Sequence, residues 1–302
     1  MIKFPPYLKP GDTIGITCPA GYMPLDKAAA CIKQLKEWDY QVRVGTTLGS
    51  ASTNFFSGTD DERLADLQEM LDDKEVHAIL FGRGGYGVGR IIDRIDFKKF
   101  KKHPKWLIGF SDITVMHTHL LSKYQIASIH GPMAALFNDA AAFNSIESLK
   151  LLLKGKKQNH TLPSNPLNKP GKGSGTLVGG NLALLCNVIG TPSDIKTTGR
   201  ILFIEDIGEY IYSLDRMFSQ LHRSGKLKGI AGLILGGFTE MKDTERPFGK
   251  TAVQVLQEWA EKVNCPVVFD FPVSHGSANV ALICGGEYQL KVTGEKTTLK
   301  LL

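Results

Sequence analysis

The sequence lacks the features that mark membrane, fibrous and disordered proteins. No stretch approaches the ~18 consecutive apolar residues of a membrane-spanning helix, and no apolar leader segment is present. Internal repeats and low-complexity tracts are absent as well. Of the 302 residues, 22% are charged and 42% hydrophobic, a balance that allows a large core to be buried. We therefore expect a globular, cytoplasmic protein of two domains, with no membrane partner.

Cysteine and concentrated positive charge are also scarce. Lys and Arg exceed Asp and Glu by only 36 to 30, and the excess is scattered apart from short lysine runs in 98–105 and 154–157. Nucleic-acid binders usually gather cations into a stripe beside aromatic residues, so no nucleic-acid partner is expected. The spacings of the five cysteines are long and irregular, with no C-x-x-C pair, which predicts buried free thiols and no metal site. The cysteines are Cys18, Cys31, Cys186, Cys265 and Cys284.

Strand and helix patterns alternate through the first half of the chain. Residues 13–18 form a β-branched run that ends in a turn and is followed by a helical pattern. Thr59 and Glu62 form a capping box, which predicts the start of another helix. Further strands are expected at 76–81 and 106–110, each followed by a helix. This alternation predicts a parallel, Rossmann-like sheet covered by helices on both faces.

The composition changes after the first half. A stretch rich in Gly, Lys, Asn and Pro predicts a linker or long loop at 156–175. We accordingly expect an N-terminal domain at 1–155 and a smaller C-terminal domain at 176–302. The second domain again mixes strands and helices but closes with a hairpin at 287–302, so its sheet contains antiparallel strands. The predicted fold class is α/β, with a β-rich C-terminal domain.

A glycine-rich turn follows the strand at 76–81. It reads Gly82-Arg83-Gly84-Gly85-Tyr86-Gly87, and its bare backbone N–H groups suit a phosphate or a developing oxyanion. The glycines also satisfy the dinucleotide pattern G-x-G-x-x-G, but the acid expected about 20 residues on is missing, since the nearest, Asp112, lies 25 past Gly87. A dinucleotide cradle, an oxyanion donor and a merely tight turn all stay open.

Two further strand ends carry polar residues, at the edge where open α/β sheets bind ligands. Ser111 lies between an apolar strand and a helix, as in a nucleophile elbow, although G-x-S-x-G fails at Ile113. An ordinary helix cap is the alternative. Glu205 and Asp206 end another apolar strand. Each could be an acid at a helix start or a member of a surface ion pair. The functional alternative is a carboxylate that orients a histidine.

The eight histidines leave two candidates for a general base. His117 shares the apolar face of its helix and reads as a core residue, and His119 lies on another face, which is poor geometry for a shared metal. His130 and His275 both occupy segments interpreted as loops and are followed by glycine, where an imidazole can face a cleft. Their positions in the chain do not separate them.

Taken together, these motifs resemble the LD-carboxypeptidase family of serine peptidases, which includes muramoyltetrapeptide carboxypeptidases and microcin C self-immunity peptidases. Each motif is weak alone, but their common order runs over almost the whole chain. The matching segments are 8–12, 58–63, 83–87, 109–112, 130–132, 179–182, 190–192, 203–206, 215–217, 231–236 and 274–276.

The resemblance implies a Ser-His-Glu triad in the chain order Ser, Glu, His. Carried over by motif, it makes Ser111 the nucleophile, Glu205 the orienting carboxylate and His275 the general base. The backbone N–H groups of Gly85 and Asp112 then match the oxyanion hole of the family. One departure concerns the residue before the histidine: many members have glycine there, where this chain has Ser274.

The resemblance also implies an activity. The expected substrate is a peptidoglycan tetrapeptide, a muropeptide cut between an L-centre diamino acid and the terminal D-Ala in cytoplasmic murein recycling, by a homodimer that needs no cofactor. Arg83 is a candidate clamp for the terminal carboxylate, with Tyr86 beside it, unless Arg83 only holds the turn or a neighbouring acid. Two alternatives stay open. One is hydrolysis of aminoacyl-nucleotide amides, as in the self-immunity branch, and the other is a non-catalytic nucleotide-binding module.

Overall fold

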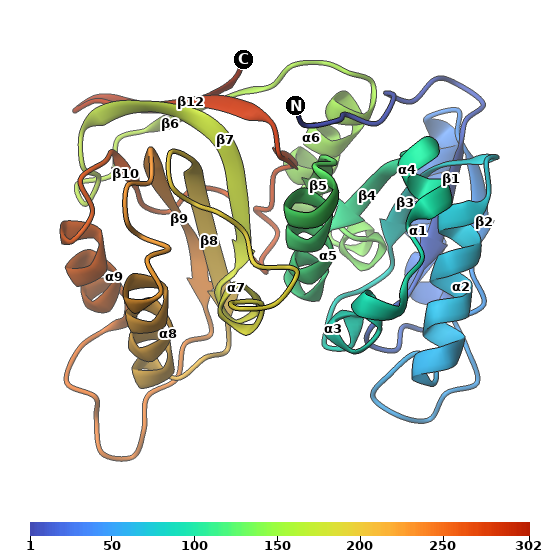
Figure 1. Cartoon of the computed structure of the whole chain (residues 1–302), viewed down its shortest axis with the longest axis horizontal. Helices are drawn as coiled ribbons and strands as arrows, with labels where there is room; N and C mark the ends of the chain where they lie inside the picture. Colours follow the sequence, from blue (N-terminus) through green and yellow to red (C-terminus); the bar gives the residue numbers. More distant parts are fainter.

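Two β-sheets with helices packed on them form the computed structural model, which describes residues 1–302 (Figure 1). The first sheet has six strands in the order β11-β5-β4-β3-β1-β2, all parallel except β11. Its strands are β1 (Thr13–Thr17), β2 (Gln41–Val44), β3 (Val76–Phe81), β4 (Trp106–Gly109), β5 (Ser128–His130) and β11 (Leu282–Cys284). The helices of this lobe are α1 (Ala29–Glu37), α2 (Asp60–Asp72), α3 (Val88–Ile91), α4 (Lys98–Lys102), α5 (Thr114–His119) and α6 (Phe143–Leu153).

The second sheet has seven strands in the order β10-β9-β8-β7-β12-β13-β6. The first four are parallel to one another, and β7, β12, β13 and β6 pair in antiparallel fashion. These strands are β6 (Asn159–Pro163), β7 (Gly171–Asn181), β8 (Ile201–Ile207), β9 (Gly232–Thr239), β10 (Val267–Val268), β12 (Glu287–Val292) and β13 (Lys296–Leu301). The helices of this lobe are α7 (Leu182–Asn187), α8 (Ile211–Arg223) and α9 (Ala252–Glu261).

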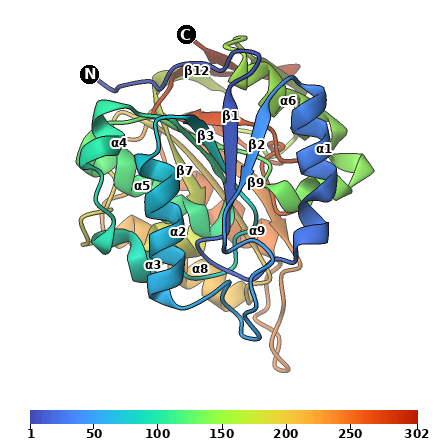
Figure 2. The same cartoon turned by 90° about the vertical axis from the view of Figure 1, so that its right-hand side faces the viewer.

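Burial explains why the two halves read so differently as sequence. The first sheet has helices on both faces, with α1 and α2 on opposite sides of β1 in Figure 2. Strand β1 is accordingly buried over its last four residues, as a central parallel strand should be. In the hairpin of β12 and β13, buried and exposed residues alternate, because only one face packs on the core. The predicted α/β class and the parallel first sheet are confirmed.

Local signals located the longer helices well. Thr59 caps α2 as predicted: its side chain accepts the N–H of Glu62, whose carboxylate accepts the N–H of Thr59. A second capping box, formed by Thr251 and Gln254, starts α9. The helical segment after Ser111 runs to Tyr124, passing from a 3₁₀ turn through α5 into a π turn. No helix of the structure is both long enough and apolar enough to cross a membrane.

The interpretation of residues 156–175 as a linker or long loop is corrected by the structure. Within 156–175, residues 159–163 form β6 and residues 171–175 begin β7, so much of it belongs to the second sheet. The prediction missed these strands because β6 is an edge strand without buried residues, and because the first half of β7 contains glycine, serine, threonine and Lys172 but no large apolar residue. Gly173 must be small, since a Cβ there would lie 1.8 Å from the carbonyl oxygen of Ala231. The limits 1–155 and 176–302 stay a prediction.

Strand β11 ties the two lobes together. It belongs to the C-terminal part of the chain, yet Leu282 and Ile283 pair with His130 and Ile129 of β5 in the first sheet. One buried cluster of 37 hydrophobic residues extends from Ile14 in β1 to Leu299 and Leu301 in β13. The lobes therefore share a core, and segments from both sheets meet between them.

Candidate active site

Ser111 lies at a sharp turn between β4 and the helical segment that contains α5. Its φ is +60°, a left-handed conformation that costs a residue other than glycine about 1–3 kcal/mol. The turn is tight because Gly109 leaves room for Ile113: a Cβ on Gly109 would lie 2.9 Å from Cγ1 of Ile113. This contact gives a physical account of why the last glycine of G-x-S-x-G is absent, since Ile113 packs into the space that Gly109 leaves.

Glu205, His275 and Ser111 form a chain of hydrogen-bonding distances. His275 Nδ1 lies 2.6 Å from Glu205 Oε2, and His275 Nε2 lies 2.9 Å from Ser111 Oγ. Glu205 is fully buried at the end of β8, and its carboxylate pairs with the imidazole of His275. With Nδ1–H donated to Glu205, Nε2 is left to accept the serine proton. The ring of His275 packs edge-on against Phe110, with 5.0 Å between ring centroids.

The loop that carries His275 is held by Ser274. Its hydroxyl donates to the carbonyl oxygen of Ala278 at 2.9 Å and accepts the N–H of Gly276 at 3.1 Å. Ser274 also sits tightly against β9, since a Cβ on Gly237 would lie 2.5 Å from Ser274 Cβ. Serine in place of glycine before His275 therefore stabilises the turn around the histidine.

Asp206 faces away from Ser111 and His275. Its Oδ1 accepts from Asn181 Nδ2 at 2.7 Å, and its Oδ2 accepts from the N–H of Ala183 at 3.0 Å at the start of α7. Of the two carboxylates at the end of this strand, only Glu205 contacts the imidazole. The local sequence left both carboxylates open and the family resemblance selected Glu205; the alternation of side chains along β8 gives the physical reason.

The interpretation of His130 as a loop residue is wrong. His130 ends β5, is fully buried, and its Nε2 lies 2.9 Å from Asn279 Oδ1. Burial lowers the pKa of His130 to about 3, so the ring is neutral. His117 is also a core residue: its nitrogens lie 2.8 Å from Ser128 Oγ and from the carbonyl oxygen of Gly109, and burial lowers its pKa to about 4. The structure contains no group of three or more His, Cys, Asp or Glu side chains arranged to hold a metal.

The glycine-rich turn lies directly against Ser111. A Cβ on Gly84 would sit 2.9 Å from Ser111 Cβ and 3.0 Å from its Oγ, so only glycine allows this approach. Gly85 has a φ of +103°, and its N–H donates to no group of the protein. A free backbone donor next to a serine hydroxyl is what an oxyanion site requires.

A cavity of about 570 Å³ opens at Ser111 and His275. Arg83 lines it and forms no ion pair; its Nη1 donates to the carbonyl oxygen of Tyr22 at 3.1 Å. Tyr86 does not line the cavity, and its half-exposed ring tilts against Phe56 with 6.0 Å between centroids. Sequence reasoning missed the segment at 133–139, which supplies much of the opposite wall and includes Asp139. No motif marks it.

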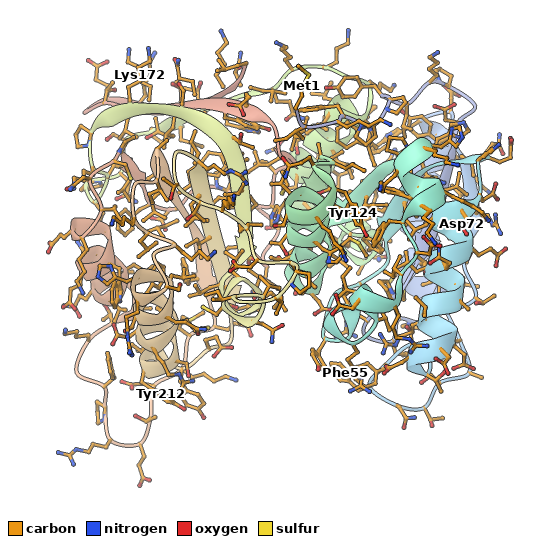
Figure 3. All side chains as sticks on the ribbon, in the orientation of Figure 1. Met1, Phe55, Asp72, Tyr124, Lys172 and Tyr212 are labelled. Atoms are coloured by element: carbon orange, nitrogen blue, oxygen red, sulfur yellow. The ribbon has the colours of Figure 1, made fainter.

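Exposed aromatic rings lie on both lobes but are not part of the cavity lining. Figure 3 shows Phe55 on the first lobe and Tyr212 on the second, and neither lines the cavity at Ser111. The one aromatic ring that does line it, Phe110, is buried against His275. Phe55 borders the cavity, since its Cζ would lie 3.5 Å from a Cβ on the lining residue Gly85.

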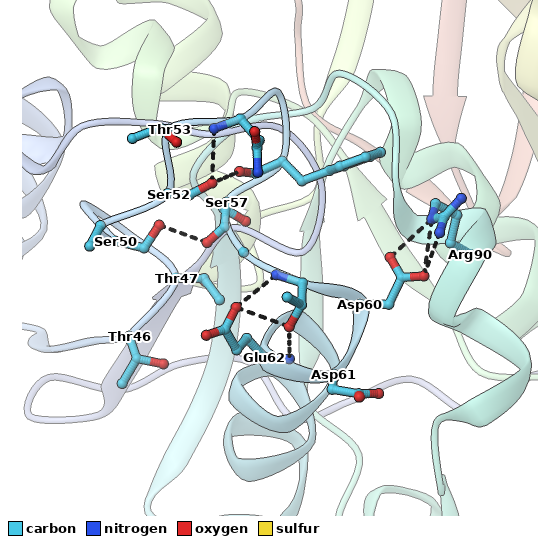
Figure 4. Close-up of a pocket in the computed structure, with 15 residues that line it drawn as sticks. Thr46, Thr47, Ser50, Ser52, Thr53, Ser57, Asp60, Asp61, Glu62 and Arg90 are labelled. Carbon is cyan, nitrogen blue, oxygen red and sulfur yellow. Dashed lines mark hydrogen bonds and ion pairs between the residues drawn. The ribbon is translucent and has the colours of Figure 1, made fainter.

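A second hollow, of about 780 Å³, lies at the N-terminus of α2 and shares no lining residue with the cavity at Ser111 (Figure 4). Its charged groups already have partners: Asp60 accepts from Arg90 Nη2 at 2.8 Å, and Glu62 accepts from the N–H of Thr59 at 2.7 Å. The hydroxyls of Ser50 and Ser52 donate to backbone carbonyls. These polar groups of the second hollow are thus already bonded to other groups of the protein.

Asp112 carries a buried charge beside Ser111. Burial raises its pKa from 3.8 to about 6, although the N–H of Val88 and the charge of Arg63 favour the ionised form. The folded state binds the carboxyl proton of Asp112 more tightly than the unfolded chain does. This proton therefore contributes fully to the free energy of unfolding below pH 4, and its contribution is lost as the pH rises through 6.

This charge predicts a pH-dependent effect of the isosteric variant Asp112→Asn. We expect the variant to gain up to about 3 kcal/mol of unfolding free energy relative to the wild type between pH 4 and pH 8, because only the wild type ionises there. Urea unfolding of both proteins at the two pH values measures the difference. A gap that does not change with pH would contradict a raised pKa.

Comparison with known proteins agrees with this architecture. The family model for the LD-carboxypeptidase N-terminal domain matches residues 14–131, and that for the LD-carboxypeptidase C-terminal domain matches 174–290. A probable murein peptide carboxypeptidase of Bacillus subtilis (strain 168) is 38% identical over 300 residues, which cover 98% of this chain and 93% of that protein.

Solved structures agree as well. The crystal structure of muramoyltetrapeptide carboxypeptidase from Oxalobacter formigenes matches with a TM-score of 0.86 at 31% identity, over 96% of this chain and 98% of that one. The microcin C7 self-immunity protein MccF, solved in complex with aspartyl sulfamoyl adenosine, shares the fold: its TM-score is 0.87 at 21% identity, over 100% of this chain and 99% of that one. The chain therefore belongs to the LD-carboxypeptidase family and is a serine carboxypeptidase.

Proposed function

We propose that the protein removes the terminal D-Ala of peptidoglycan tetrapeptides by cutting the bond that follows an L-centre diamino acid, with Ser111, His275 and Glu205 as its catalytic triad. The observation that carries the proposal is the continuous chain from Ser111 Oγ to His275 at 2.9 Å and on to the buried Glu205 at 2.6 Å, at the wall of a cavity. The names of the similar proteins, a murein peptide carboxypeptidase and a muramoyltetrapeptide carboxypeptidase, support the substrate class.

Acylation begins with Ser111. Its Oγ attacks the scissile carbonyl carbon while its proton passes to Nε2 of His275, and Glu205 stabilises the resulting imidazolium through Nδ1–H. The negative charge on the tetrahedral oxygen is stabilised by the N–H groups of Gly85 and Asp112. As the C–N bond breaks, His275 returns the proton to the leaving amine, and D-Ala departs.

Deacylation repeats the same steps with water. His275 takes a proton from the water, the hydroxide attacks the ester carbonyl, and the same two N–H groups stabilise the second oxyanion. The proton then returns to Ser111 Oγ as the shortened peptide leaves. Because the nucleophile comes from the first lobe and the carboxylate from the second, the reacting groups meet between the lobes.

The charges of the cavity complement the end of such a peptide. Arg83 is the cation that lines it without an ion pair, and its guanidinium can donate to the terminal carboxylate of D-Ala. Asp139 is the one carboxylate that lines it, and it suits the side-chain ammonium of a diamino acid. A guanidinium forms two parallel hydrogen bonds with a carboxylate, which would fix the register of cleavage at the last residue.

Removing the guanidinium of Arg83 tests this clamp. We expect Arg83→Ala to raise KM for the free-acid tetrapeptide by about 10- to 100-fold, since a charge-assisted hydrogen bond contributes about 1.5–3 kcal/mol. Arg83→Lys should recover part of the loss. A tetrapeptide ending in D-alaninamide is the control, because both variants should cleave it as the wild type does. An unchanged KM for the free acid in Arg83→Lys and Arg83→Ala would show that Arg83 only holds the turn through Tyr22.

The aminoacyl-nucleotide alternative finds less support. MccF is described in complex with aspartyl sulfamoyl adenosine, but here the one aromatic ring that lines the cavity, Phe110, is buried against His275, and the exposed Phe55 only borders it. Family membership as a carboxypeptidase also removes the ground for a non-catalytic nucleotide-binding module.

A direct assay tests the proposed reaction. The purified protein and its Ser111→Ala variant are incubated with a muropeptide tetrapeptide ending in D-Ala and with an all-L version, and the products are followed by mass spectrometry. The proposal requires loss of one alanine from the D-terminated peptide alone, and only with Ser111 present. Failure of the folded wild type to cleave either peptide would reject it, and an aminoacyl sulfamoyl adenylate would be the next substrate.

We place this reaction in cytoplasmic murein recycling by a homodimer. All five cysteines are free and buried, which suits a reducing compartment. Sedimentation of the purified protein tests the dimer.

A further inference from the structure

The glycine-rich turn is anchored on nearly every side except the one that faces Ser111. The N–H of Gly82 donates to the carbonyl oxygen of Thr17 at 2.9 Å, and the carbonyl oxygen of Gly84 accepts the N–H of Gly21 at 3.0 Å. The N–H of Gly85 follows directly after the second anchor and has no partner in the protein. It shares a planar peptide unit with the carbonyl of Gly84, so Gly21 holds the near side of this unit. The position of the free N–H also depends on what fixes the far end of the turn, at Gly87 and Val88.

The side chain of Asp112 fixes that far end. Its Oδ2 accepts the N–H of Val88 at 2.8 Å, where the turn passes into α3. Asp112 is fully buried and directly follows Ser111, so one residue joins the nucleophile turn to the glycine-rich turn. Its own backbone N–H is the second donor of the proposed oxyanion hole. The far end of the turn is thus joined to the second donor through this carboxylate.

Arg63 anchors the same end of the turn from the other side. Its guanidinium is fully buried; Nη1 donates to the carbonyl oxygen of Gly87 at 3.1 Å and also to that of Pro19. The approach is so close that a Cβ on Gly87 would lie 2.7 Å from Nη1. Asp60 pairs with Arg63 and is in turn held by Arg90 (Figure 4), so the guanidinium is itself fixed. Its charge also faces the carboxylate of Asp112.

We propose that the carboxylate of Asp112, assisted by Arg63, is a positioning residue for the oxyanion hole: it holds the N–H of Gly85 in register with the N–H of Asp112. This inference rests on the proposed function, in which those two groups stabilise the tetrahedral oxygen. Asp112 then contributes twice, through its backbone as a donor and through its side chain as the link between the two donors. Substrate binding in the ground state does not depend on this link.

The test compares catalysis with affinity for a tetrahedral adduct. We expect Asp112→Ala to lower kcat about 10- to 100-fold with KM within about twofold, because displaced donors act mainly on the transition state. Affinity for a peptide boronic acid ending in boro-lysine, whose adduct with Ser111 places an oxygen in the hole, should fall by a similar factor. Asp112→Asn retains an acceptor for the N–H of Val88 and should recover most of both losses.

The control is a second buried carboxylate next to a member of the triad. Asp206 is as buried as Asp112 but binds Asn181 and Ala183 instead of the glycine-rich turn. Asp206→Ala is therefore expected to lower stability and to leave kcat per active site within about threefold. All rates are taken per active site, titrated with a fluorophosphonate, well below the unfolding temperature.

Distinct outcomes separate the inference from the proposed function. If the wild type neither cleaves the tetrapeptide nor binds the boronic acid, the proposed function fails. If it does both, and Asp112→Ala keeps its kcat and boronate affinity, the positioning role is wrong; equal losses in Asp112→Ala and Asp206→Ala reject it too. Should Asp112→Ala not fold, Arg63→Lys tests the link from the other side, with an expected loss in kcat of about 3- to 10-fold and none in KM. An unchanged kcat there would overturn the inference.

Discussion

Replacing Ser111 by alanine is expected to lower kcat by about 10⁵- to 10⁶-fold, with KM almost unchanged. The hydroxyl is the proposed nucleophile, and no other hydroxyl lies within hydrogen-bonding distance of the His275 ring. What remains is the stabilisation of the oxyanion for direct attack by water, worth about 10³–10⁴ over the uncatalysed reaction. Release of D-Ala from the tetrapeptide, followed by mass spectrometry over hours, measures the residual rate.

The matched control for this variant is Ser52→Ala. The Ser52 hydroxyl donates to the carbonyl oxygen of Phe56 in the second hollow, so its loss should leave kcat within about twofold. Alanine at 111 also relieves none of the backbone strain, because a Cβ remains at φ +60°. Both variants should therefore unfold close to the wild type in urea. A Ser111→Ala protein that keeps more than about a thousandth of the wild-type kcat would assign the nucleophile to another group.

Glu205→Gln is expected to lower kcat by about 10³- to 10⁴-fold while the protein still binds its peptide. The glutamine amide retains the shape of Glu205 but carries no charge to stabilise the imidazolium. Oε1 of Glu205 has no hydrogen-bond partner, so nothing prevents the amide from turning its NH₂ toward Nδ1. Nε2 would then carry the imidazole proton and could not accept one from Ser111.

Steady-state kinetics on the tetrapeptide give kcat and KM for this variant. Asp206→Asn, at the next position in the chain, is the control. Asp206 does not contact His275, so its neutral variant should retain kcat within about threefold. A Glu205→Gln protein within tenfold of the wild-type kcat would mean that the histidine needs no charged partner and that Glu205 is not a member of the triad.

Much of the first sheet could be predicted from the sequence because its strands are marked locally. Strands β1, β3 and β4 are mostly apolar or β-branched and are followed within two residues by proline, glycine or serine, and α2 starts at a capping box. Motif order also named Ser111, Glu205 and His275, which the structure brings together. For Ser111 and Glu205 the local signal was a polar side chain at the end of a buried strand, whereas His275 was chosen over His130 only through the family resemblance.

What could not be predicted depends on contacts between distant segments. His130 and His275 are both followed by glycine, and His130 is buried because β5 pairs with β4 and β11 and its ring packs against Phe203. Strands β10 and β11 have two and three residues, too short for any periodicity. The cavity wall at 133–139 contains no motif because it follows the shape of the neighbouring lobe. Asp112 was predicted for its backbone alone, since its bond to Val88 spans 24 positions.

The loop that carries His275 is suspended between the lobes: β10 precedes it in the second sheet, and β11 follows it in the first. This has a consequence for synthesis of the chain on the ribosome. Ser111 and Glu205 are synthesised well before His275. Strand β5 also lacks its antiparallel neighbour until β11 has been made. Contacts of such long sequence separation form late in folding. A partly synthesised chain thus lacks a complete active site. The chain becomes able to hydrolyse its substrate only when β11 has completed the first sheet.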